Sequence, residues 1–192
     1  MSPRRTKAPA LREFQELWRN FRGLSTTALG GSVAAPFAVA LIHLSPPWPR
    51  GILPLTALVE FLILVAVFQL LPKATRKRAG RLIVFGLLLL FVISIVYLLA
   101  FSRFTFEVPT KHETYVKGYA CTANAALVYG ARCPDLGLDE LQTAEYEAER
   151  LWTRDSIAVV RTGLVVLWLM AFALLSVVLG TFLVYQSRRP RA

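Results

Sequence analysis

The chain has 192 residues, 55% of them hydrophobic, and a formal net charge of +10. Its mean hydropathy of +0.51 exceeds that of soluble domains of this length, which argues against an ordinary soluble enzyme. A basic nucleic-acid-binding protein is also disfavoured, because the basic residues flank hydrophobic runs and the short basic loop 72–81 contains no aromatic side chain.

Residues 1–23 are predicted to form a cytoplasmic amphipathic helix that lies in the lipid headgroup region. Four apolar residues recur there at steps of three and four: Leu11, Phe14, Trp18 and Phe21. Arginines occupy other positions on the helical wheel, which is typical of a helix at a membrane surface. The alternative is a docking helix for a cytosolic partner or a neighbouring subunit.

Four hydrophobic stretches are long enough to cross a bilayer core, which takes about 20 helical residues. They are residues 24–44, 52–71, 82–101 and 157–185. The predicted fold class is therefore an all-α membrane protein, a four-transmembrane-helix bundle. The first stretch is rich in small residues that let helix backbones approach closely: Ala28, Gly30, Gly31, Ser32, Ala34 and Ala35. Packing within one chain explains them as well as oligomerisation does.

Basic residues are sorted to one side of the predicted spans. Fourteen of them lie in residues 1–23, in the loop 72–81 and in the tail 186–192, whereas the loop between the first two spans has only Arg50. Residues 102–155 carry six basic and nine acidic residues, a net charge of −3. The positive-inside rule then places both termini in the cytoplasm and residues 102–156 outside. We expect a multi-pass protein of the plasma (inner) membrane. Its basic loop is expected to bind anionic lipids through Arg76, Lys77, Arg78 and Arg81.

Two charged residues fall within the predicted spans, where charges are costly. Counted from the outer ends of their spans, Glu60 is about 12 Å deep and Arg161 about 6 Å deep, so we expect the two side chains to pair. A structural ion pair is favoured, and an ion or proton path through Glu60 is the alternative. Trp168 is expected to face other helices, because its indole N–H needs a partner. Trp48 and Trp152 are expected at the outer lipid interface.

The outer loop domain, residues 102–156, is predicted to be a small α+β element. Residues 104–108 and 113–119 have the pattern of strands. Residues 122–130 are expected to form about two helical turns that end at Gly130. Residues 138–152 are expected to form one helix that could run into the last span.

Cys121 and Cys133, the two cysteines of the chain, are predicted to form a disulfide within this loop domain. The compartment is oxidising, and the chain between them can turn back on itself. A zinc site is disfavoured, because it needs about four ligands and the loop offers these cysteines and His112. A catalytic thiol is disfavoured, because the second cysteine would consume the nucleophile.

The layout of four spans, a short first outer loop and a larger, cysteine-containing second one resembles that of tetraspanins. The Cys-Cys-Gly motif of that family is missing from this sequence. Four-helix membrane thiol oxidoreductases have a similar topology, but their Cys-x-x-Cys motif is missing too. The resemblance is one of topology.

The sequence contains no metal constellation, activated nucleophile or dinucleotide fingerprint, so neither a cofactor nor catalytic activity is expected. We expect a non-enzymatic assembly or interaction module that forms homo-oligomers through its spans and contacts a protein partner through its outer loop. The alternative is an oligomeric ion channel or membrane-permeabilising effector, for example of a bacterial defence system, with Glu60 in the path. A small transporter subunit is the second alternative.

Overall fold

The computed structural model describes residues 35–41, 44–49, 51–71, 76–108 and 113–187. This part is mostly helical, and three of its helices are long and apolar enough to cross a membrane. They are α3 (Ile52–Leu70), α4 (Arg76–Phe104) and α8 (Arg154–Ser187). The last three predicted spans are thus confirmed as long apolar helices. Most of the predicted first span lies outside the described residues, although residues 35–41 are helical.

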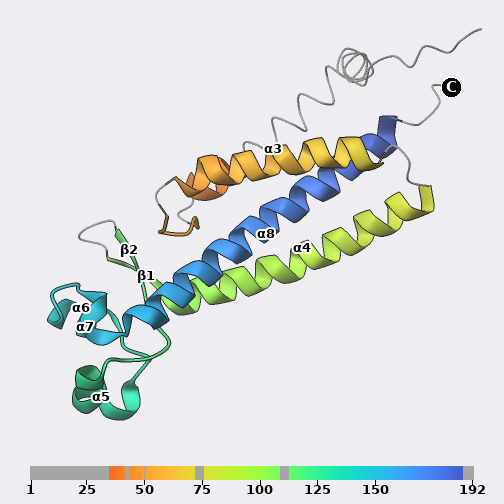
Figure 1. The fold of residues 1–192 in the computed structure, drawn as a ribbon. Helices are drawn as coiled ribbons and strands as arrows, with labels where there is room; N and C mark the ends of the chain where they lie inside the picture. Colours follow the sequence, from red (N-terminus) through yellow and green to blue (C-terminus); the bar gives the residue numbers. More distant parts are fainter. Residues whose placement is uncertain (1–34, 42–43, 50, 72–75, 109–112, 188–192) are drawn as a thin grey trace, which may run out of the picture.

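Helix α8 packs between α3 and α4 (Figure 1). Two pairs of neighbouring residues give its direction relative to α3. Trp168 of α8 is hydrogen-bonded to Thr56 of α3, and Gly180 of α8 lies against Val67 of α3. The residue numbers increase together along both helices, so α3 and α8 run in the same direction.

Helix α4 packs against α8 in the opposite direction. The ring of Tyr97 lies 5.7 Å from that of Trp168, measured between centroids, whereas Gly86, earlier in α4, lies against Val178, later in α8. The three long helices therefore alternate in direction along the chain, as they must if the chain crosses a layer three times in succession. This follows from the contacts alone, without any assumption about charge.

Two glycines allow the helices to approach closely. A Cβ atom at Gly86 would lie 2.7 Å from Cγ2 of Val178, and one at Gly180 would lie 3.0 Å from Cγ1 of Val67. Small residues at such positions let helix backbones pack in lipid, where no hydrophobic force drives helices together. Each glycine lies inside an apolar run, where the local sequence does not mark it as a packing position.

Buried side chains from all three helices, together with Val116 from the segment between α4 and α8, form one core. It consists of Ile52, Tyr97, Val116, Val160, Leu164, Trp168 and Phe172. The outward face of α4 is also apolar, with Phe85 68% exposed and Phe91 and Leu99 each 64% exposed. A large exposed apolar surface is unfavourable in water and favourable in hydrocarbon. The exposure of α4 therefore agrees with a helix surrounded by lipid.

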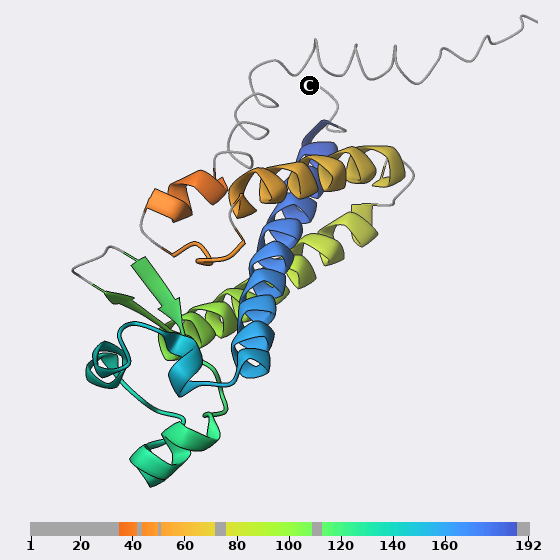
Figure 2. The same ribbon diagram turned by 60° about the vertical axis from the view of Figure 1, so that its left-hand side comes forward.

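The connecting segment, residues 105–153, joins α4 to α8. Strands β1 (Thr105–Val108) and β2 (Glu113–Val116) lie within the two stretches predicted as strands, and the structure pairs them antiparallel. They are followed by α5 (Ala123–Tyr129), the short 3-10 helix η2 (Gly130–Arg132), α6 (Leu138–Thr143) and α7 (Ala148–Leu151). Figure 2 shows these elements gathered where α4 ends and α8 begins.

The predicted single helix over residues 138–152 is wrong, because the structure divides it into α6 and α7. In the turn between them, Glu145 and Tyr146 have positive φ angles of 58° and 64°. The turn allows Leu141 before it and Leu151 after it to join the same buried cluster. The chain then becomes extended at Trp152, so α7 does not run into α8.

Candidate functional site

Cys121 and Cys133 form the predicted disulfide, with their Cα atoms 6.2 Å apart. Between them the chain forms α5 and η2 and turns back. The Thr122 hydroxyl accepts a hydrogen bond from the Ala125 N–H at 3.3 Å and so caps the start of α5. Gly130, with φ at 51°, ends the helix in a conformation that favours glycine. The disulfide therefore fixes a short helix to the connecting segment.

Trp152 is fully buried in the core of the connecting segment. Its indole Nε1 donates a hydrogen bond to the Pro134 carbonyl oxygen at 3.0 Å, and its backbone pairs with that of Cys121. Trp152 thus contacts both ends of the disulfide loop. Its predicted position at a lipid interface is wrong, because a side chain with no exposed surface cannot reach headgroups.

Glu140 caps α6 and ties it to η2. Its Oε2 accepts the Gly137 N–H at 2.8 Å, and its Oε1 forms an ion pair with Arg132. Two backbone hydrogen bonds lower the pKa of this carboxyl, one from the Gly137 N–H and one from its own backbone N–H, and so do the charges of Arg132 and Lys117. These effects outweigh burial, which raises the pKa. Together they hold the pKa of the carboxyl below its ordinary value of 4.5. Glu140 is therefore a structural carboxylate.

Helix α5 presents two large apolar side chains to solvent, Leu127 at 85% and Val128 at 74% exposure. We call these two residues the α5 apolar pair. Ala125 is the buried residue of the helix and faces the core of the connecting segment. Figures 1 and 2 both show α5 at the margin of the connecting segment, away from the three long helices.

Glu60 of α3 is fully buried inside the bundle. Ser176 of α8 lies beside its carboxyl group. Within the described residues, neither carboxyl oxygen of Glu60 has a hydrogen-bond partner, and the Ser176 hydroxyl has none either. A buried polar group without a partner costs about 1–3 kcal/mol. These oxygens can therefore accept a proton, a cation or a water molecule.

The predicted ion pair between Glu60 and Arg161 is not formed in the described part of the chain. Ser176, beside Glu60, comes fifteen residues after Arg161 on α8, which is about 22 Å along a helix. The prediction assumed that the two helices begin at the same level. They do not, because Thr56, close to the start of α3, is level with Trp168, fourteen residues into α8.

A hydrogen-bonded pair joins α3 to α8. The Trp168 Nε1 donates to the Thr56 hydroxyl at 2.9 Å, and that hydroxyl donates to the Ile52 carbonyl oxygen at 2.7 Å. The prediction that Trp168 faces other helices is thus confirmed. Thr56 was missed, because a threonine inside an apolar run can satisfy its hydroxyl on its own helix.

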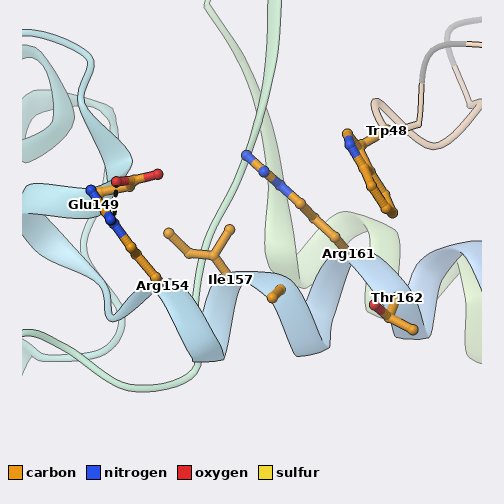
Figure 3. Close-up of a pocket in the computed structure, with 7 residues that line it drawn as sticks. Trp48, Glu149, Arg154, Ile157, Arg161 and Thr162 are labelled. Atoms are coloured by element: carbon orange, nitrogen blue, oxygen red, sulfur yellow. Dashed lines mark hydrogen bonds and ion pairs between the residues drawn. The ribbon is translucent and has the colours of Figure 1, made fainter.

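A cleft of about 220 Å³ lies at the start of α8 (Figure 3). Its lining consists of Trp48, Glu149, Arg154, Ile157, Ala158, Arg161 and Thr162. Arg154 Nε forms an ion pair with Glu149 Oε2 at 2.6 Å. Arg161 Nε is buried and has no hydrogen-bond partner among the described residues. Figure 3 shows the Arg161 side chain extending between this ion pair and the Trp48 ring.

The remaining predicted residues fall into two groups. Ala35 is partly buried against the core of the bundle, and Lys77, Arg78 and Arg81 are exposed near the start of α4, which begins at Arg76. The other residues proposed for packing or for the interfacial helix lie outside the described part: Leu11, Phe14, Trp18, Phe21, Ala28, Gly30, Gly31, Ser32 and Ala34. Their predicted roles stay predictions.

Among the described residues, no group of three or more His, Cys, Asp or Glu side chains could hold a metal ion. His112 lies outside that part. Comparison of the chain with protein-family models, with curated proteins and with solved structures gave no match.

Proposed function

We propose that the chain is a non-enzymatic membrane protein whose copies assemble through their spans and through the connecting segment. In this arrangement it crosses the plasma (inner) membrane four times, with both termini in the cytoplasm and the connecting segment outside. Three long apolar helices support the membrane part of the proposal. The basic residues at the start of α4 and the disulfide in the connecting segment support the orientation.

The α5 apolar pair is the observation that carries the assembly proposal. Fully burying a leucine or valine side chain contributes about 1.5–3 kcal/mol, and these two are 85% and 74% exposed. The disulfide holds their helix in place, so little conformational entropy is lost when a partner covers them. The position of α5 away from the long helices favours a protein surface over the bilayer as the cover.

The partner is proposed to be a second copy of this chain. Two side chains bury much less than the roughly 800 Å² per partner of a stable interface, so the α5 apolar pair needs additional contact area. The outward apolar face of α4 offers that area, but only to a chain that is itself embedded in lipid. A second copy has both surfaces.

Subunit counting in liposomes tests this proposal. The full chain is compared with the double variant Leu127→Ser/Val128→Ser and with a control, Asn124→Ser, on the same helix. Wild type and control are expected to be oligomeric. The double variant is expected to have a dissociation constant at least about tenfold higher, which corresponds to a loss of about 1.4 kcal/mol of association free energy. A monomeric wild type, or a double variant that associates like the control, contradicts the proposal.

An ion path is the second candidate function, and Glu60 is the observation that favours it. Buried carboxyl groups inside a bundle are rare and are found in proton relays and ion pathways. Here the carboxyl and the Ser176 hydroxyl have no hydrogen-bond partners in the described part of the chain. The path would run between α3 and α8, on the level of these two side chains.

Proton and sodium flux into liposomes tests the ion path. Glu60→Gln keeps the size of the side chain, and Gln69→Ala changes an exposed position on the same helix as a control. The ion path predicts flux in wild type and control, and its loss in Glu60→Gln with unchanged oligomer mass. Impermeable wild-type liposomes contradict the ion path but leave the assembly proposal standing.

The proposed orientation has a separate test. After mild reduction, Cys121 and Cys133 should react with an impermeant thiol reagent in intact cells or spheroplasts. Labelling that occurs only after lysis would place the connecting segment in the cytoplasm and contradict the orientation.

A further inference from the structure

We propose that the cleft at the start of α8 binds the phosphate group of an anionic lipid through Arg161. The assembly proposal makes no use of this cleft. Its volume of about 220 Å³ and its mixed polar and apolar lining suit a headgroup with the first part of its glycerol backbone.

The cleft lies at the level where the apolar part of the bundle begins. Ile52, the first residue of α3, belongs to the same buried cluster as Val160 and Leu164. Arg161 lies between these two on α8, so it is level with the start of α3. A bilayer that covers the apolar length of α3 would therefore place its headgroups at this cleft.

The two arginines that line the cleft differ in their pairing. Arg154 is paired with Glu149, and that pair leaves no net charge. Arg161 has no ion pair within the described part of the chain, and its buried Nε has no acceptor. A guanidinium group donates parallel hydrogen bonds that match a phosphate, and such charge-assisted bonds are the strong ones. A phosphate group bound by the terminal nitrogens of the guanidinium would balance the charge.

The walls favour a lipid over free phosphate. Trp48 is 49% exposed beside Arg161, and tryptophan is enriched at the headgroup level of membranes. The Tyr97 hydroxyl donates a hydrogen bond to the Leu44 carbonyl oxygen at 2.6 Å, which ties the stretch containing Trp48 to α4. Ile157 and Ala158 add apolar surface to the lining. An inorganic phosphate would leave these apolar walls uncovered.

Lipid binding to the full chain in detergent, measured by native mass spectrometry, tests the proposal. The probes are phosphatidylglycerol and inorganic phosphate, and the variants are Arg161→Gln, Arg161→Lys and Arg103→Gln. Arg103 is the control for loss of one positive charge, because it lies near the end of α4, outside the cleft, is 62% exposed and is paired with Asp135. The melting temperature of each variant shows whether it is folded.

Arg161→Gln is expected to weaken phosphatidylglycerol binding by about tenfold or more, through loss of the charge-assisted hydrogen bonds. Arg161→Lys should keep the charge and lose part of the affinity, whereas Arg103→Gln should change it less than about twofold. Inorganic phosphate should not compete at millimolar concentrations.

Equal losses in Arg161→Gln and Arg103→Gln would show non-specific attraction and overturn the proposal. Displacement of the lipid by inorganic phosphate would overturn the assignment to lipid. Should Arg161→Gln fail to fold, an unchanged affinity in Arg161→Lys overturns the role of the guanidinium.

Discussion

The contact between α4 and α8 at Gly86 can be tested with a single added methyl group. In Gly86→Ala, the new Cβ would lie 2.7 Å from Cγ2 of Val178, whereas carbon atoms in contact are about 3.5–4.0 Å apart. One helix must therefore move away by about 1 Å, because a β-branched valine has little rotamer freedom. The same substitution at Gly163 of α8 meets no atom within 4 Å, which makes Gly163→Ala the matched control.

The expected free-energy difference between the two variants follows from these distances. Both gain the same helix propensity, about 1 kcal/mol for replacing glycine with alanine. Only Gly86→Ala incurs the cost of overpacking, about 1–3 kcal/mol. Subtracting the two changes in unfolding free energy cancels propensity and leaves the steric cost alone. We expect Gly86→Ala to be less stable than Gly163→Ala by about 1–3 kcal/mol.

Unfolding by sodium dodecyl sulfate in mixed micelles, followed by circular dichroism at fixed protein concentration, measures this difference. A difference smaller than about 0.5 kcal/mol, below the usual overpacking cost, would show that α4 and α8 do not pack at Gly86. The arrangement of α8 between α3 and α4 would then be wrong at that point.

Three further predictions concern the connecting segment and the α3–α8 contact. The double variant Cys121→Ala/Cys133→Ala should lose about 3 kcal/mol of stability in the connecting segment, seen as faster amide hydrogen exchange there and unchanged exchange in the long helices. In wild type, the contribution of the ionised Glu140 side chain to the free energy of unfolding should be complete above pH 4.5, its ordinary pKa. It should be lost as the pH falls through the lower pKa of the folded state. Glu140→Gln should lower stability at neutral pH by about 1–2 kcal/mol and flatten this pH dependence in urea titrations; an unchanged pH profile would contradict the role of the carboxylate. A double-mutant cycle of Trp168→Phe and Thr56→Val should give a coupling of about 0.6 kcal/mol and at most about 1.7 kcal/mol, whereas zero coupling would argue against their hydrogen bond.

Features set by local composition could be predicted from the sequence. Long apolar runs give α3, α4 and α8, because a helix in lipid must satisfy its backbone internally. The two short strands follow from alternating residues. The disulfide follows from having two cysteines on either side of a helix that ends at Gly130. Each of these depends on neighbours in the chain.

Features set by the registration of distant elements could not be predicted. The depth of Arg161 was misjudged, because only the structure shows that α8 begins far before the level of α3. Trp152 was assigned to lipid on residue type, although it is buried by the fold of the connecting segment. The helix break at Tyr146 requires a positive φ angle, which is unfavourable for a non-glycine residue. Burial of residues from both sides of the turn in one core offsets this cost.

The uninterrupted length of α8 has a mechanical consequence. Its 34 residues make a helix of about 51 Å that begins at the disulfide-bonded connecting segment. A tilt of about 10° at that end would swing the opposite end by about 9 Å, from the same rise per residue. Because α8 packs between α3 and α4, such a tilt at the disulfide-bonded end would have to move the far ends of these helices as well.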